Sequence, residues 1–172
     1  MIYAGAQKNL GPAGATLYLV DPEKLGNTGR AIPTMLNLET HIKKDSMFNT
    51  PPVFPVFVSM LMLEWLKEKG GVDVIEKENQ AKADLLYSAI DELPLFSGTT
   101  AVEDRSNMNA TFVLNDEALK GEFDAAWKAA NISGLKGHRS VGGYRASMYN
   151  ALPIESVQVL VDVMKEFAQR KG

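Results

Sequence analysis

The 172-residue chain contains no cysteine and only two histidines, His41 and His138. The absence of cysteine excludes a disulfide framework, a thiolate metal site and a cysteine nucleophile. A conventional zinc site would need several carboxylates besides the two histidines, so we expect no metal centre. A formal net charge of −3 argues against non-specific binding of nucleic acid.

Long apolar runs are also scarce in this sequence. The most apolar stretch, residues 51–63, contains Ser59 and falls short of the roughly 20 residues that a membrane span needs. Residues 1–5 have neither the basic region nor the apolar region of a secretory signal. Together with the missing cysteines, these features predict a cytoplasmic protein that is not bound to a membrane.

From residue 71 onward the apolar residues recur with regular spacing. Their helical spacing predicts three helices, at 72–93, at 115–130 and from Pro153 onward. Alternation and β-branched or aromatic residues predict three short strands, at 111–114, 132–136 and 144–149. Amphipathic helices that alternate with a few short strands favour a two-layer α/β sandwich.

The first 70 residues are less regular. Strands are expected at 3–7 and 16–20, an irregular stretch from Asp21 to Pro52, and then a helix over 54–65 that is apolar nearly all round at its start. Such a helix needs partners on most sides. We therefore expect the back half of a larger protein, with residues 1–70 ending one domain and 71–172 forming a small domain.

Lys8 lies among small residues, in Ala4-Gly5-Ala6-Gln7-Lys8-Asn9-Leu10-Gly11. An amine that attacks a carbonyl needs little steric cover and partial removal from water, and a strand end followed by a glycine turn offers both. The alternative interpretation is an ordinary solvated lysine, as most lysines are.

Residues 134–145 combine four glycines, several cations and His138, with no carboxylate. A glycine-rich loop can turn backbone N–H groups inward, and the guanidinium groups of Arg139 and Arg145 can bind carboxylate or phosphate oxygens in a bidentate manner. This pattern indicates an anion site; a hairpin with solvated arginines is the alternative.

Two further stretches have local interpretations. Asn49 and Thr50 stand before Pro51-Pro52 and a helix, where they could bind a phosphate or simply cap the helix. Asp104-Arg105-Ser106 is expected to be a local turn with an ion pair.

Five stretches together resemble one enzyme family: Tyr3-Ala-Gly-Ala-Gln-Lys-Asn9, Ile32-Pro-Thr-Met-Leu36, Ser46-Met-Phe-Asn-Thr-Pro-Pro52, Val102-Glu-Asp-Arg-Ser106 and Lys136-Gly-His-Arg-Ser-Val-Gly-Gly143. The sequence resembles the phosphoserine aminotransferases, pyridoxal-phosphate enzymes of the class V aminotransferase family. The resemblance implies the α/β fold of the aspartate aminotransferase-like enzymes, and it extends from about residue 2 to the last helix. The front half of the family has no counterpart in these residues.

The resemblance also implies roles at the cofactor. Lys8 matches the lysine that holds pyridoxal phosphate covalently and later moves a proton, and Gln7 matches a neighbouring residue that contacts the cofactor. Asn49 and Thr50 match a pair that reaches the cofactor phosphate of the other subunit in a homodimer.

For the substrates, glutamate and a phosphorylated 2-oxo acid, three residues match. Arg145 corresponds to the clamp on the α-carboxylate, and His138 and Arg139 correspond to residues near the substrate phosphate. The resemblance implies transamination between glutamate and 3-phosphohydroxypyruvate. It also implies that this chain alone is inactive, because the aspartate that pairs with the cofactor ring lies in the missing half. The alternative function is a non-catalytic α/β module that binds an anion or a partner.

Overall fold

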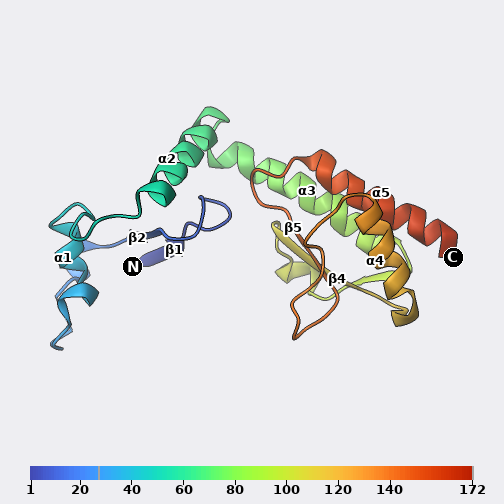
Figure 1. Ribbon diagram of the computed structural model, residues 1–172, viewed down its shortest axis with the longest axis horizontal. Coiled ribbons are helices and arrows are strands. Elements are labelled where there is room, and N and C mark those ends of the chain that lie inside the picture. Colours follow the sequence, from blue (N-terminus) through green and yellow to red (C-terminus); the bar gives the residue numbers. More distant parts are fainter. Residues whose placement is uncertain (27, 172) are drawn as a thin grey trace. The chain divides into compact units, whose positions relative to one another are not determined.

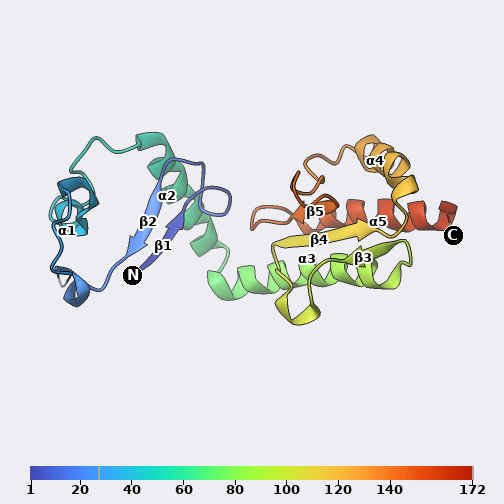
Figure 2. The same ribbon diagram turned by 90° about the horizontal axis from the view of Figure 1, so that it is seen from below.

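The computed structural model describes residues 1–26 and 28–171 and divides into two compact units, Met1–Glu68 and Lys69–Gly172. We call them unit 1 and unit 2 (Figures 1 and 2).

Unit 1 consists of a hairpin and two helices. The antiparallel strands β1 (Ile2–Gly5) and β2 (Thr16–Leu19) pair over their whole length, and the helices are α1 (Leu38–Ile42) and α2 (Val53–Glu68). The prediction that 21–52 is irregular throughout was wrong. Asn37 accepts a hydrogen bond from the Glu39 backbone N–H and so caps α1, and two short 3-10 helices lie at Pro22–Lys24 and Thr34–Leu36.

Unit 1 buries very little apolar surface by itself. Ala6 is its buried hydrophobic residue, and α2 contains no buried residue. The side chains of α2 that remain exposed include Phe54, Phe57, Met60 and Leu61. Among the described residues no helix is both long enough and apolar enough to cross a membrane.

Unit 2 is a two-layer α/β sandwich, as its sequence pattern predicts. Its antiparallel sheet has the order β3-β4-β5, formed by Phe96–Gly98, Asn109–Leu114 and Tyr144–Ser147. Its helices are α3 (Val72–Glu92), α4 (Lys120–Ala129) and α5 (Ile154–Lys171). A short 3-10 helix, Glu117–Leu119, precedes α4, and the Asp116 side chain caps it. In both views α3 and α5 lie side by side, next to the strands (Figures 1 and 2).

Two strand predictions for unit 2 need correction. The segment 132–136 is not a strand, and only Lys136 forms an isolated bridge, with Tyr144. Positive φ angles of 58° at Asn131 and 72° at Gly134 break the extended conformation there. The short strand β3 was not expected from the sequence.

The core of unit 2 lies on one face of this sheet. On β4, Ala110, Phe112 and Leu114 are buried and alternate with half-buried residues. The Phe112 and Tyr144 rings stack with centroids 5.3 Å apart, and Phe123 of α4 meets Tyr144 edge-on at 5.1 Å. The helices therefore cover one face and leave the other face, which includes Thr111 and Arg145, to polar side chains.

The ion pair expected within residues 104–106 is not local. Arg105 donates two hydrogen bonds to Asp91 of α3, at 2.6 and 2.7 Å, and lies 4.5 Å above the Tyr87 ring. The hydrogen bond from Arg105 holds the pKa of the Asp91 carboxyl below its usual value. This pair ties the segment before β4 to α3.

Lys82 is a buried charged residue on α3, only 2% exposed. Its Nζ donates to the carbonyl oxygens of Met148, Tyr149 and Leu152, at 3.3, 2.9 and 3.1 Å. Burial lowers the pKa of this amine. These hydrogen bonds satisfy carbonyl groups in the connection from β5 to α5, and so fix the end of β5.

We expect Lys82→Met to lower the free energy of unfolding by about 2–4 kcal/mol, because buried carbonyl groups would lose their donor. Lys77→Met, at an exposed lysine of the same helix, is the matched control and should change stability by less than about 0.5 kcal/mol. Denaturant titration measures both. Equal stability of the two variants would contradict the structural role of Lys82.

Candidate functional site

Lys8 follows β1 in a tight turn whose backbone is fixed by hydrogen bonds. Its φ angle is 82°, in the left-handed region that residues other than glycine rarely adopt. The Lys8 N–H donates to the Gly11 carbonyl at 2.8 Å, and the Leu10 N–H donates to the Ala6 carbonyl at 3.0 Å. A strained residue held in this way is a feature of functional sites.

The residues around this turn have small side chains, as expected, but they do not bury Lys8. A Cβ added to Gly11 would lie 2.8 Å from Ser59 Oγ of α2, so the turn packs closely on that helix. The Lys8 side chain itself is exposed, which corrects the expectation of partial removal from water. Within unit 1, α2 supports the turn from the Gly11 side.

Gln7 lies beside Lys8 in the same turn. A Cβ added to Gly5 would be 3.5 Å from Gln7 Nε2, so the side chain of Gln7 lies over Gly5. The structure thus places the amide of Gln7 and the amine of Lys8 on consecutive residues at one end of the hairpin.

Asn49 and Thr50 are exposed and precede α2 by a short proline segment. Because α2 begins at Val53, Pro52 occupies the position before the helix, and neither polar residue can be its N-cap. Asn49 Nδ2 lies 3.7 Å from Met35 Sδ. The capping alternative is therefore wrong, and a polar amide and hydroxyl remain exposed.

The segment 136–144 closes on itself as a narrow loop, the basic loop. Lys136 and Tyr144 are bridge partners, and the Gly137 N–H donates to the Gly143 carbonyl at 2.9 Å. A Cβ on Gly137 would overlap the carbonyl oxygen of Gly142, so only glycine allows the two sides to come this close.

Within the basic loop, Ser140 fixes the ring of His138. The Ser140 N–H donates to His138 Nδ1 at 3.4 Å, and Ser140 Oγ lies 2.7 Å from the same atom. A backbone N–H can only donate, so Nδ1 accepts and the neutral ring carries its proton on Nε2. Nε2 is then a hydrogen-bond donor, as an anion requires.

Arg145 lies on β5, opposite Thr111 of β4. Its backbone N–H donates to the Leu135 carbonyl at 2.7 Å, which anchors the residue to the segment before the basic loop. Its Nε is buried and has no hydrogen-bond partner among residues 1–26 and 28–171. An unsatisfied guanidinium donor of this kind suits an acceptor supplied by a ligand.

One of the three cations of this region, Lys136, has a carboxylate partner. Asp124 of α4 pairs with Lys136 at 3.2 Å. Arg139 and Arg145 form no ion pair with any residue that the structure describes, so they are the positive charges left for an anion.

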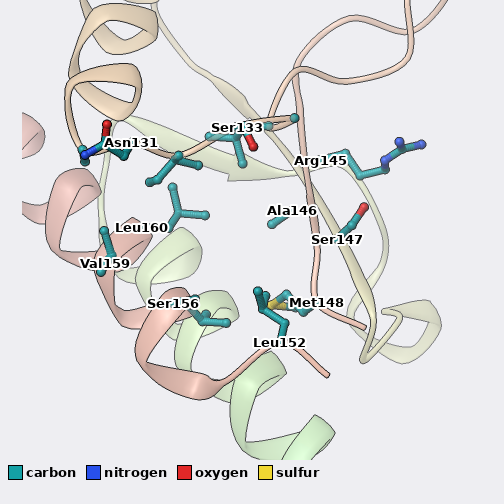
Figure 3. Close-up of a pocket in the computed structure, with 15 residues that line it drawn as sticks. Asn131, Ser133, Arg145, Ala146, Ser147, Met148, Leu152, Ser156, Val159 and Leu160 are labelled. Carbon is teal, nitrogen blue, oxygen red and sulfur yellow. The ribbon is translucent and has the colours of Figure 1, made fainter. Parts of the chain in front are cut away.

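A cavity of about 470 Å³ lies beside β5. Figure 3 shows Met148, Leu152 and Leu160 around this cavity, whereas the side chains of Arg145 and Ser147 point away from it. Arg145 and Ser147 are themselves among the lining residues, but the guanidinium group of Arg145 points out of the cavity.

The candidate site residues fall into two sets. Gln7, Lys8, Asn49 and Thr50 belong to unit 1, and His138, Arg139 and Arg145 belong to unit 2. In the described residues, no cluster of histidine and carboxylate side chains could hold a metal ion.

Comparison with known proteins gives a consistent result. The family model "Aminotransferase class-V" matches residues 1–160. The phosphoserine aminotransferase of Flavobacterium psychrophilum is 66% identical over 170 residues, which are 99% of this chain and 48% of that protein. The Bacillus cereus enzyme of the same name is 52% identical, over 97% of this chain and 46% of its own length. This chain thus spans about half the length of the curated relatives it matches.

Solved structures agree with the sequence comparison. The phosphoserine aminotransferase of Bacillus circulans subsp. alkalophilus has a TM-score of 0.93 and 44% identity, covering 99% of this chain and 47% of that chain. The pyridoxal-phosphate-bound enzyme of Trichomonas vaginalis has a TM-score of 0.81 and 34% identity, covering 95% of this chain and 47% of that chain.

The close crossing in the basic loop generates a stability prediction. Gly137→Ala should lower the free energy of unfolding by about 1–3 kcal/mol, because its methyl group overlaps a fixed carbonyl. Gly121→Ala is the control, since a Cβ at Gly121 in α4 meets nothing within 4 Å and alanine favours a helix. Thermal unfolding measures both, and an unchanged Gly137→Ala would contradict the crossing.

Proposed function

The chain belongs to the class-V aminotransferase family, and on this basis we propose that it supplies the cofactor lysine and part of the substrate site of a phosphoserine aminotransferase. The proposed reaction transfers the amino group of glutamate to 3-phosphohydroxypyruvate and yields phosphoserine and 2-oxoglutarate. The observation that carries this proposal is Lys8, an amine held with a left-handed backbone in a hydrogen-bonded turn among small residues.

The residues of unit 1 fit pyridoxal phosphate. The Lys8 amine would hold the cofactor covalently through its carbonyl carbon, whose oxygen would leave as water, while the Gln7 amide offers a neighbouring polar contact. Asn49 and Thr50 offer an amide and a hydroxyl for the cofactor phosphate of a second subunit, because neither is occupied as a helix cap. When bound, the cofactor supplies the electron sink that stabilises negative charge at the substrate Cα.

In this proposal Lys8 has a second role as an acid and base. With the cofactor and substrate in place, its Nζ would take the proton from the substrate Cα and would hold it for return to the reacting atoms. The fixed backbone of the turn limits where the amine can reach, so the proton is moved between two nearby atoms.

The residues of unit 2 suit the two ends of the substrate. Arg145 has an unsatisfied Nε–H on a strand that is pinned by hydrogen bonds, so its fork can hold the α-carboxylate common to both substrates. Arg139 and the Nε2–H of His138 lie in the basic loop and suit a phosphate group.

We also propose that the intact enzyme is a homodimer. The exposed apolar side chains of β1, β2 and α2, among them Tyr3, Leu17, Phe54 and Phe57, exceed what a stable surface normally leaves in water. The remaining sequence of the enzyme and a second subunit would cover them. By itself, the chain of 172 residues should lack transaminase activity, because the resemblance places the aspartate for the cofactor ring outside these residues.

The proposal is tested by trapping the cofactor with borohydride and mapping the modified lysine. A chimera that joins the amino-terminal half of the Flavobacterium psychrophilum enzyme to this chain should be modified at Lys8 with about one cofactor per chain. Lys8→Arg should abolish both the trapping and transamination, whereas Lys24→Arg, at an exposed lysine of unit 1, should change neither.

The chain alone is expected to react weakly and at several lysines. Selective, stoichiometric modification of Lys8 in the chain alone would contradict its proposed incompleteness. Modification spread over many lysines of an active chimera would contradict the role of Lys8.

The substrate roles are tested by the kcat/KM of the chimera for each substrate. Arg145→Lys keeps the charge but loses the fork, so it should weaken the use of glutamate and of the phosphorylated substrate alike. His138→Ala and Arg139→Ala should penalise the phosphorylated substrate by about 1–3 kcal/mol more than glutamate. Lys165→Ala, which removes an exposed cation from α5, is the control. An effect of Arg145→Lys on only one substrate would show that the roles are assigned wrongly.

A further inference from the structure

One carboxylate of unit 2 receives hydrogen bonds from three different side chains. Asp124 Oδ1 accepts from the Tyr144 hydroxyl at 3.0 Å and from Trp127 Nε1 at 3.1 Å. Its Oδ2 lies 3.2 Å from Lys136 Nζ, and the side chain is only 14% exposed. Burial by itself would raise the pKa of this carboxyl, but the three donors outweigh burial and lower it. Asp124 is therefore a fixed negative charge at neutral pH.

Two of these donors stand at the two ends of the basic loop. Lys136 and Tyr144 are bridge partners, and the residues between them carry His138 and Arg139. Asp124 thus binds both ends of the loop to α4, while its third donor, Trp127, comes from α4 itself.

Few backbone hydrogen bonds join the two sides of the basic loop, so its closed conformation depends on contacts near Lys136 and Tyr144, where the loop begins and ends. Among the described residues, two backbone hydrogen bonds join its two sides: the Gly137 N–H donates to the Gly143 carbonyl, and the Arg145 N–H donates to the Leu135 carbonyl. At the tip, the N–H groups of Val141 and Gly142 both donate to the His138 carbonyl. Glycines at 137, 142 and 143 have no side chains that could pack the two sides together. The contacts of Asp124 with Lys136 and Tyr144 can hold the two sides together instead.

Asp124 also decides which cation the loop presents. Its ion pair holds the Lys136 ammonium toward α4, leaving the guanidinium of Arg139 and the Nε2–H of His138 as the donors at the tip. A rigid pair of donors is better suited to a tetrahedral dianion than a mobile set of three.

We propose that Asp124 is the positioning residue of the basic loop, and that by binding Tyr144 and Lys136 it sets His138 and Arg139 for a phosphate monoester. This inference rests on the proposed function, because that function assigns the phosphate to these two residues.

The test uses the full chain and two measurements, amide hydrogen exchange and the affinity for inorganic phosphate. Asp124→Asn keeps Oδ1 as an acceptor for Tyr144 but places an amide donor against Lys136 and removes the charge. Tyr144→Phe removes the other contact with the loop and leaves the charge in place. Asp162→Asn is the matched control, since it removes one negative charge from α5, where Asp162 accepts a hydrogen bond from Gln158.

In the Asp124→Asn and Tyr144→Phe variants, the amides of Gly137 and Gly142 should exchange about tenfold faster or more, while those of Ala110 and Phe112 in β4 stay unchanged. The dissociation constant for phosphate, measured well below the melting temperature of each variant, should rise about three- to tenfold; with the β4 amides unchanged, this loss cannot come from general unfolding. Asp162→Asn should leave all of these values unchanged.

Unchanged loop exchange in both variants, or an equal acceleration in the loop and in β4, would overturn the proposal. Faster loop exchange with unaltered phosphate affinity would overturn it as well. If the unsubstituted chain does not bind phosphate, the proposed phosphate site fails, and the exchange comparison still decides whether Asp124 holds the loop.

Discussion

Tyr144 and Ala146 point into the core of unit 2, so Arg145 between them must point to the opposite face of the sheet. This alternation determines most of what the unit can do. The stacked rings of Phe112 and Tyr144 fix the register of β4 and β5, and that register places Arg145 opposite Thr111. A slip by one residue would bury the guanidinium among aromatic rings, where its removal from water would be costly. The packing of the core therefore also determines the direction in which the Arg145 side chain points.

The same core supports the basic loop through Tyr144. Its ring belongs to the aromatic cluster, and its hydroxyl donates to Asp124 at the edge of that cluster. Burial, with the hydrogen bond to Asp124 adding to it, raises the pKa of this phenol well above its ordinary value, so it remains a donor at every physiological pH. A rigid aromatic residue therefore connects a packed interior with a loop that glycine would otherwise leave loose. Unit 2 can in this way offer fixed donors from a segment with almost no packing of its own.

The sequence predicts those parts of unit 2 whose side chains repeat with the period of their element. Ile75, Ala83, Leu86 and Ile90 mark the buried face of α3, and the alternation in 144–149 predicts the faces of β5. Ile132 and Leu135 contribute to the core from a segment with positive φ angles, so their apolar character predicts a strand where the backbone is not extended.

Contacts between distant residues have no such period and were missed. Asp124 precedes Lys136 by twelve positions and Tyr144 by twenty, and Arg105 pairs with Asp91 fourteen residues away. Lys82 lies beside Ala83 on the buried face of α3, where a helical pattern alone would place an apolar residue.

In unit 1 the main candidate residue, Lys8, has a strained backbone but lies in a unit that buries little apolar surface. A left-handed Lys8 costs of order 1–3 kcal/mol of backbone strain, and such strain persists only where surrounding structure enforces it. In unit 1 that enforcement comes from backbone hydrogen bonds at Ala6 and Gly11 and from the contact of Gly11 with α2, close to the buried Ala6. If the exposed apolar face of α2 were covered, the helix would be stabilised. Because Gly11 packs on α2, the turn that holds Lys8 would be stabilised as well. In the proposed dimer, the covering of α2 and the placement of the Lys8 amine would therefore be coupled through this one helix.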